Sequence, residues 1–165
     1  MAQGGAGSTG SAGAVFRGVT QLALDAKGRL AIPARHRDAL TGSPEGANRA
    51  LVVTADPSRC LLLYPCATWE PIQARLMALS SFNEQLRGLQ RLLVGHADDV
   101  DMDGAGRILV PPALRQYAGL EHRVVLVGQG NKFELWDEAK WEEQTARAIT
   151  CPADGLPPEL GGFSL

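Results

Sequence analysis

The chain contains an internal repeat, and this repeat limits its possible folds more than any other feature of the sequence. Residues 25–37, which read DAKGRLAIPARHR, align with residues 103–115, which read DGAGRILVPPALR, at a constant offset of 78 (103 minus 25). Further along, residues 63–70 (LYPCATWE) align with residues 135–142 (LWDEAKWE) at an offset of 72 (135 minus 63). Because two ordered blocks recur in the same order, the sequence predicts two copies of one small structural unit.

The repeat divides the chain into five parts. We expect a first repeat over residues 16–80 and a second over residues 95–150, joined by a connecting helix over residues 81–94 that packs on a shared core. Residues 1–15 consist mainly of Gly, Ala and Ser, which is typical of a flexible arm and of neither a signal peptide nor a core segment. Residues 151–165 form a C-terminal tail.

The connecting helix is predicted from its own pattern. Ser81 and Glu84 have the spacing of a capping box. Apolar side chains then recur at helical spacing along the segment: Phe82, Leu86, Leu89 and Leu93.

Each repeat begins with two predicted strands. Residues 21–24 and residues 29–32 alternate in the way that half-buried strands do, with four apolar side chains pointing inward: Leu22, Leu24, Leu30 and Ile32. Prolines then suit the start of a short helix and glycines its end, at Pro33 and Gly42 and again at Pro111 and Gly119. Further strands over residues 51–53 and 124–127 complete a mixed α+β fold that is rich in β-structure.

A tight turn separates the first two strands of each repeat. The pattern Asp-x-x-Gly favours a type I turn, because Asp25 can accept backbone N–H bonds and Gly28 tolerates a positive φ. We therefore expect a β-hairpin whose tip carries Lys27 and Arg29. Asp103 and Gly106 predict the same turn in the second repeat, with Arg107 just after it.

Basic residues gather around the first turn although the chain as a whole is slightly acidic. The formal net charge of −2 argues against a protein that coats nucleic acid through bulk positive charge. Between residues 16 and 37, however, Asp25 is the single acid among five basic residues: Arg17, Lys27, Arg29, Arg35 and Arg37. The sequence therefore predicts one local basic face.

The recurring Asp-x-x-x-Arg pattern has two interpretations. An arginine just past a tight turn can project from the protein and contact phosphates or the major-groove edge of guanine. Alternatively, the aspartate caps its turn and the arginine forms a surface ion pair with it, which needs no ligand. Arg35 and Arg37 have the same two interpretations, as DNA contacts or as a solvated helix face.

Little in the sequence supports an enzyme, a metal site or a cofactor. Three histidines and three cysteines are scattered without metal-ligand or triad-like spacing: His36, His96, His122, Cys60, Cys66 and Cys151. No apolar run approaches the roughly 20 residues that span a bilayer. We expect no enzymatic activity, no metal, no cofactor, no small-molecule substrate and no membrane association.

Several blocks of the sequence together resemble the MraZ family. They are DAKGRLAIPARHR, DGAGRILVPPALR, CLLLYP, QRLLVGHA and VLVGQGNKFELWDEAKWE, and the resemblance covers residues 16–149. It implies tandem AbrB-like repeats, with swapped-hairpin or double-psi-like strands and short helices packed as one pseudo-symmetric domain. It also implies a cytoplasmic, nucleoid-associated transcriptional regulator that forms a homo-oligomeric ring on double-stranded DNA, at repeated promoter sequences of the division and cell-wall gene cluster.

The resemblance also assigns roles to residues, because the family's DNA-contacting signature is its paired Asp-x-x-x-Arg motif. We expect five residues to contact DNA: Arg29, Lys27, Arg107, Arg35 and Arg37. We expect four to support the loops: Asp25, Gly28, Asp103 and Gly106. The alternative is a protein-interaction or scaffold module whose basic face docks an acidic partner.

Overall fold

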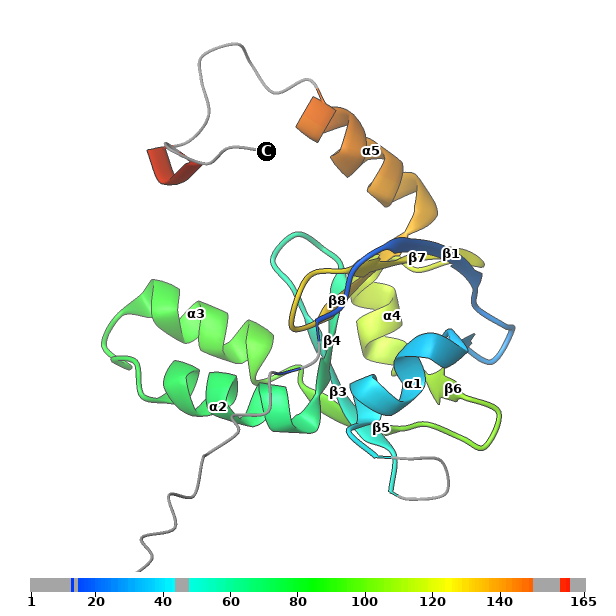
Figure 1. Cartoon of the computed structure of the whole chain (residues 1–165). Helices are drawn as coiled ribbons and strands as arrows, with labels where there is room; N and C mark the ends of the chain where they lie inside the picture. Colours follow the sequence, from blue (N-terminus) through cyan, green and yellow to red (C-terminus); the bar gives the residue numbers. More distant parts are fainter. Residues whose placement is uncertain (1–12, 14, 44–47, 150–157, 161–165) are drawn as a thin grey trace, which may run out of the picture.

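The computed structural model describes residues 13, 15–43, 48–149 and 158–160 (Figure 1). The predicted arm and tail therefore lie almost entirely outside the described residues. Pro158–Leu160 is a short 3-10 turn. Among the helices of the described segments, none is both long and apolar enough to cross a lipid bilayer.

A six-stranded antiparallel sheet forms the centre of the molecule. Its strands lie in the order β1 (Val19–Ala23), β7 (Arg123–Gly128), β8 (Phe133–Asp137), β4 (Leu61–Pro65), β3 (Ala50–Ala55) and β5 (Asp98–Asp101). Each repeat lends one edge strand to the other, since β1 pairs with β7 of the second repeat and β5 pairs with β3 of the first. The two repeats consequently fold as one interlocked unit with mixed α+β architecture.

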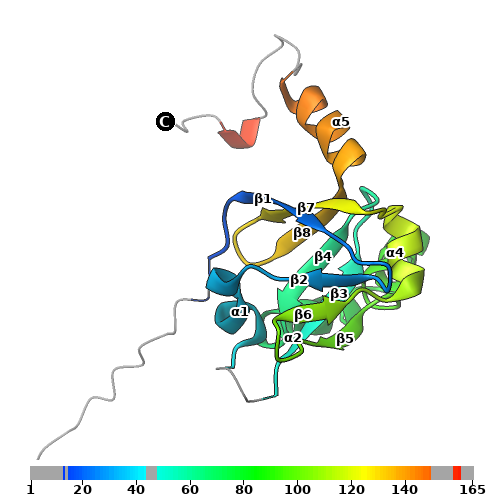
Figure 2. The ribbon, with the colours of Figure 1, turned by 90° about the vertical axis from the view of Figure 1, so that its right-hand side faces the viewer.

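A two-stranded antiparallel ribbon crosses one face of this sheet. It consists of β2 (Arg29–Ala31) from the first repeat and β6 (Arg107–Leu109) from the second. Figure 2 shows the ribbon in front of the sheet. A short helix of the first repeat lies at one end of the ribbon, and a short helix of the second repeat lies at the other. We call these two strands the ribbon.

The ribbon corrects the prediction that residues 21–24 and 29–32 pair with each other as a hairpin. That pairing is limited to one bridge, between Leu24 and Leu30. Beyond it the two strands separate, because β1 finds its partner in β7 and β2 finds its partner in β6. The predicted inward side chains do face the core: Leu24, Leu30 and Ile32 are buried, and Leu22 packs at its margin.

The short helices begin and end as the prolines and glycines predict. Helix α1 (Ala34–Thr41) follows Pro33 and stops at Gly42, whose φ is +66°. Helix α4 (Pro112–Ala118) follows Pro111 and stops at Gly119, whose φ is +60°. Both glycines adopt the left-handed conformation that closes a helix and that residues with a Cβ disfavour.

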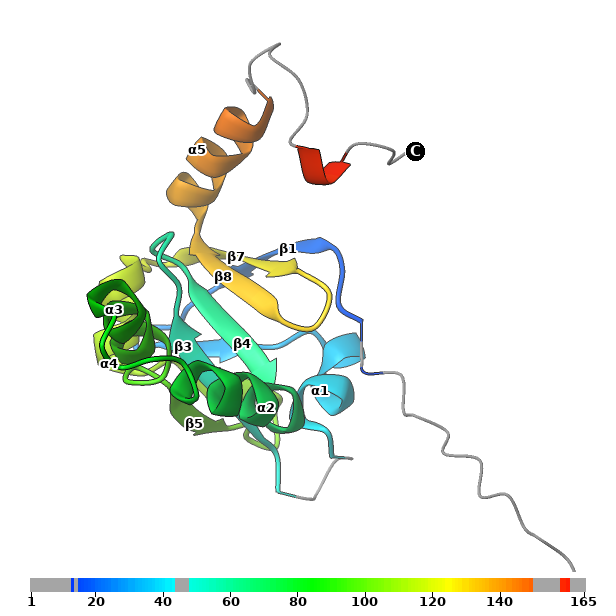
Figure 3. The same cartoon turned by 90° about the vertical axis from the view of Figure 1, so that its left-hand side faces the viewer.

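Two further helices form a hairpin on the opposite face of the sheet (Figure 3). They are α2 (Cys66–Met77) and α3 (Glu84–Leu93), and the latter is the predicted connecting helix in a shorter form. The predicted capping box is wrong, because the side chain of Asn83, not Ser81, accepts the N–H of Leu86. Phe82 therefore lies before the helix and is fully exposed.

Helix α5 (Glu138–Ile149) is the counterpart of α2 in the second repeat and projects from the body (Figure 1). Both faces of the central strands are buried. The main core lies between the sheet and the ribbon, and two smaller clusters cover the other face. Tyr64, Trp69 and Trp136 belong to these clusters and are buried.

Candidate nucleic-acid interface

The first turn, residues 25–28, is closed by backbone and side-chain hydrogen bonds of Asp25. The N–H of Gly28 donates to the carbonyl of Asp25 at 2.9 Å. Oδ1 of Asp25 accepts the N–H groups of Lys27 and Arg29, both at 2.9 Å, while Oδ2 accepts Nε of Arg29 at 2.7 Å. These bonds favour the ionised carboxylate, led by the backbone N–H of Arg29, and hold the pKa of Asp25 at about 2.

The second turn, residues 103–106, has the same geometry. Oδ1 of Asp103 accepts the N–H groups of Ala105 and Arg107 at 2.9 Å, and Oδ2 accepts Nε of Arg107 at 2.9 Å. The pKa of Asp103 is likewise lowered, chiefly by the backbone N–H of Arg107. The glycine that ends each turn has a positive φ, +83° at Gly28 and +76° at Gly106. The sequence repeat is therefore a repeat of one atomic arrangement.

Each ion pair engages only one edge of its arginine. Within the described residues, the terminal Nη1 and Nη2 groups of Arg29 and Arg107 have no hydrogen-bond partner. The two side chains are 34% and 38% exposed. A guanidinium held at Nε still offers two parallel N–H donors at its end, which is the arrangement that binds an acceptor pair bidentately. The predicted ion pairs are therefore present. They use only Nε of each arginine, so the two interpretations of the Asp-x-x-x-Arg pattern are compatible.

The ribbon brings both arginines onto one solvent-facing surface. Leu30 and Ile108 point into the core, so their strand neighbours point outward. The outer face of the ribbon carries four side chains: Arg29, Ala31, Arg107 and Leu109. The two arginines are diagonal neighbours on opposite strands, a relation that separates Cα atoms by about 7–8 Å.

Each turn is fastened to the other repeat. The N–H of Val110 donates to the carbonyl of Gly28 at 3.0 Å, and the N–H of Ile32 donates to the carbonyl of Gly106 at 2.9 Å. The guanidinium of Arg115, on α4, lies where a Cβ on Gly28 would stand. Because these contacts join the repeats, the turns and the ribbon form one rigid surface.

Arg37 occupies the matching place beneath the second turn. Its guanidinium lies where a Cβ on Gly106 would stand, and its Nε donates to the carbonyl of Ile32 at 2.8 Å. The structure places this half-buried arginine under the turn, in contact with the backbone, and its DNA contact stays a prediction. The sequence signal was present: Arg37 and Arg115 end the two aligned blocks, which indicates a shared structural position.

The remaining predicted contacts lie in two places. Lys27 is exposed at the tip of the first turn, next to the ribbon. Arg35 is exposed on α1, but its guanidinium bonds to Thr20 Oγ1 at 3.1 Å and to the ring of His36 at 3.0 Å. Its contacts are therefore with β1 and its own helix, and with neither turn.

The two ends of the ribbon differ in charge. Strand β5, which leads into the second turn, carries Asp98, Asp99 and Asp101. Strand β1, which leads toward the first turn, carries no charged side chain. Phosphates are repelled by carboxylates, so the aspartates of β5 disfavour nucleic acid along that strand. The first turn carries Lys27 and Arg29, and Glu121 lines a hollow beside it together with Asp25 and Ala26.

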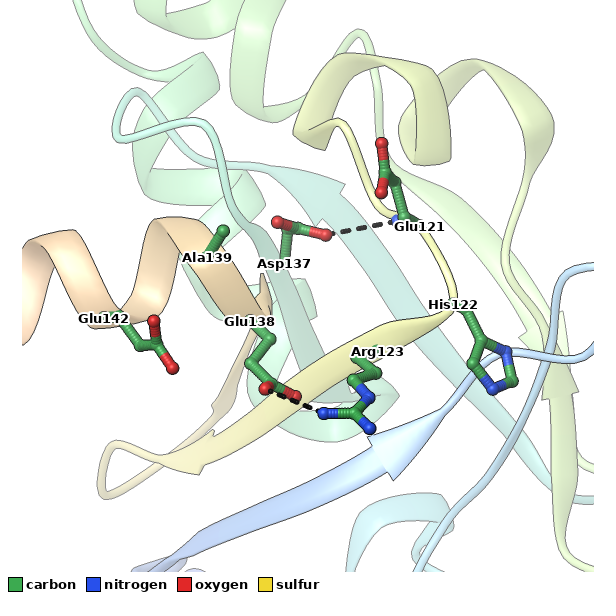
Figure 4. Close-up of a pocket in the computed structure, with 7 residues that line it drawn as sticks. All are labelled: Glu121, His122, Arg123, Asp137, Glu138, Ala139 and Glu142. Carbon is green, nitrogen blue, oxygen red and sulfur yellow. Dashed lines mark hydrogen bonds and ion pairs between the residues drawn. The ribbon is translucent and has the colours of Figure 1, made fainter.

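Elsewhere, the structure has an open pocket of about 390 Å³ between α5 and the segment before β7 (Figure 4). Four carboxylates line it: Glu121, Asp137, Glu138 and Glu142. Asp137 accepts the N–H of Glu121 at 3.3 Å, and Glu138 pairs with Arg123 at 3.6 Å. Its negative charge disfavours nucleic acid, and across the described parts of the chain no group of three His, Cys, Asp or Glu side chains is arranged to hold a metal ion.

Comparison with known proteins identifies one matching family and several similar proteins. A family model described as "MraZ protein, putative antitoxin-like" matches twice, over residues 15–92 and 93–154. The chain is 61% identical over 151 residues to a protein of Nitrosospira multiformis and 59% identical to one of Nitrosomonas eutropha, in each case over 92% of this chain and all of the relative. A protein of Halorhodospira halophila is 52% identical over 155 residues, with the same coverage. All three are named "Transcriptional regulator MraZ".

Proposed function

The chain belongs to the MraZ family, and from this premise and the geometry of the ribbon we propose that it is a sequence-specific DNA-binding transcriptional regulator. Its targets are short repeated promoter sequences of the division and cell-wall gene cluster, as the family resemblance implies. One observation supports the proposal most: two arginines share an exposed ribbon face, and the terminal N–H groups of each have no partner among the residues that the structure describes. A two-stranded antiparallel ribbon fits the width of the major groove, where arginine binds O6 and N7 of guanine.

The aspartates act through the arginines and do not touch DNA. A carboxylate beside a phosphate is repulsive, but Asp25 holds Nε of Arg29 at 2.7 Å and so fixes the direction of the free guanidinium end. Asp103 does the same for Arg107 at 2.9 Å. Fixing a side chain before binding reduces the entropy that binding must overcome. Arg37 and Arg115 support the two turns from below, and Lys27 adds a phosphate contact at the first turn.

Assembly into a homo-oligomeric ring completes the proposal. One chain offers only a few cationic contacts, which gives weak binding that salt readily disrupts. Several identical ribbons placed against spaced DNA repeats would convert these weak contacts into high avidity. We place the protein in the cytoplasm, associated with the nucleoid, and we assign it no enzymatic activity, cofactor or small-molecule substrate.

The proposal is tested by fluorescence anisotropy with a duplex from the gene's own upstream region and a scrambled duplex, at several salt concentrations. We expect a clear preference for the upstream duplex and a steep salt dependence. Arg29→Ala should weaken specific binding by about 5- to 150-fold, the value of one bidentate arginine–guanine pair. Arg107→Ala should weaken it less, because β5, the strand that leads into the second turn, carries three aspartates.

Arg75→Ala is the matched control, since Arg75 is exposed on α2, across the sheet from the ribbon. It should bind like the wild type. Equal, weak binding of wild-type protein to both duplexes would contradict the proposal and favour a basic face that docks an acidic protein. Loss of folding in Arg29→Ala would assign that ion pair a structural role instead.

A further inference from the structure

The ribbon's outer face exposes a leucine beside an arginine. Leu109 is 51% exposed, whereas its strand neighbours Ile108 and Val110 are 1% and 0% exposed. Exposed leucines are common on protein surfaces, so exposure alone indicates nothing. This one stands directly opposite Arg29 in the register of the ribbon, on the surface that the proposed function turns toward DNA.

The hydrogen-bond pattern brings these two side chains close together. The backbone bonds at either end of the ribbon join Val110 to Gly28 and Ile32 to Gly106. Bonded and non-bonded pairs alternate along an antiparallel ladder, so Arg29 and Leu109 form a non-bonded pair. The Cα atoms of such pairs are about 4.5 Å apart, and their side chains approach more closely than those of bonded pairs. This separation is similar to the rise of about 3.4 Å between successive bases of a DNA strand.

We propose that Leu109 is a specificity-determining residue, whose side chain contacts the C5-methyl group of a thymine adjacent to the guanine bound by Arg29. The inference rests on the proposed function. In the major groove, the thymine methyl group is the one apolar feature of the base edges, and apolar side chains recognise it by contact. A guanidinium and a leucine side by side on one ribbon therefore suit a guanine and a thymine on neighbouring base pairs.

The repeat shows that this pair is asymmetric. Ala31 aligns with Leu109 at the offset of 78 and stands opposite Arg107. Its methyl group is too short to extend as far from the backbone as a leucine side chain. We therefore assign the thymine contact to the Arg29–Leu109 pair. The two ends of the ribbon then recognise different bases, which two identical pairs would not.

The test uses the full-length protein and a duplex selected by it from a random library. Each thymine of one binding site is replaced in turn by deoxyuridine, which removes only the C5-methyl group, and binding is measured by anisotropy. For the wild type, we expect one thymine whose replacement weakens binding about fourfold, equivalent to about 0.8 kcal/mol for one buried methyl group. In Leu109→Ala the same replacement should have no effect, and Leu109→Met should restore it.

Leu79→Ala is the matched control, because Leu79 is 43% exposed and follows α2 on the far side of the sheet. It should retain the wild-type response to deoxyuridine. If the wild type binds its selected duplex specifically but responds to no replacement, or Leu109→Ala responds as strongly as the wild type, the inference is wrong and the proposed function stands. If selection enriches no sequence, the proposed function fails, and the inference fails with it.

Discussion

Replacing Gly106 with alanine tests whether the second turn packs on Arg37 of the first repeat. Gly106 has a φ of +76°, a left-handed conformation that costs an L-residue about 1–2 kcal/mol. The new Cβ would also overlap the guanidinium of Arg37, displacing its Nε from the carbonyl of Ile32. Loss of that hydrogen bond adds about 1 kcal/mol. We expect the free energy of unfolding to fall by about 2–3 kcal/mol in all.

The assay is urea and thermal unfolding at fixed protein concentration, since assembly makes the transition depend on concentration. For a chain of this length, the melting temperature should fall by about 4–12 °C. Gly104→Ala is a control in the same turn, because Gly104 has no positive φ and a Cβ there would meet no atom within 4 Å. It should leave stability unchanged or raise it slightly. Equal stability of the two variants would refute the claim that the turn is seated on Arg37.

Three further predictions follow from burial and charge. Leu30→Ala should lower the free energy of unfolding by about 2–5 kcal/mol in urea titration, because Leu30 is fully buried where the repeats meet; a smaller loss would contradict that packing. The pKa of Asp25 is lowered from 3.8 to about 2, so its contribution is present above pH 4 and lost between about pH 4 and 2. Asp25→Asn should flatten the dependence of the free energy of unfolding on pH over that interval. An unchanged dependence would show that Asp25 is not the group responsible. Burial, followed by repulsion from Arg35, lowers the pKa of His36 from 6.5, so wild-type stability should decrease as the pH falls below about 6.5. His36→Gln should lack that decrease, and its persistence would point to another group.

Local chemistry made part of the fold predictable from the sequence. Helix α1 begins after Pro33 because proline cannot continue a helix toward its N-terminus. It ends at Gly42 because glycine adopts a φ of +66° without strain. Asp25 and Gly28 predicted their turn for similar reasons, since the aspartate bonds its own backbone. These features depend on a few neighbouring residues, and the structure confirms them.

Strand pairing was not predictable in the same way. Residues 21–24 and 29–32 have the alternation of a hairpin, yet β1 and β2 pair with β7 and β6 of the other repeat. Alternation determines which side of a strand is buried and leaves its partner undetermined. Phe82 was misassigned for a related reason: its spacing suits a helix, but Asn83 caps the helix one residue after it.

The candidate site was predictable in its residues and not in its arrangement. The repeated Asp-x-x-x-Arg pattern identified Arg29 and Arg107, but two separate hairpin tips were expected. The structure places both arginines on one ribbon because β2 of the first repeat pairs with β6 of the second. No sequence pattern distinguished Leu109. Its exposure follows from the register in which β2 and β6 pair, and the sequence alone does not determine that register.

Replacing guanine by 7-deazaguanine, one position at a time, in the selected duplex tests directly whether Arg29 binds guanine in the major groove. This change removes the N7 acceptor and leaves base pairing intact. If the guanidinium end of Arg29 binds guanine, one replacement per site should weaken wild-type binding by about fivefold, the value of one hydrogen bond, and leave Arg29→Ala binding unchanged. If the wild-type protein binds every substituted duplex as tightly as the parent duplex, Arg29 does not bind N7 of a guanine.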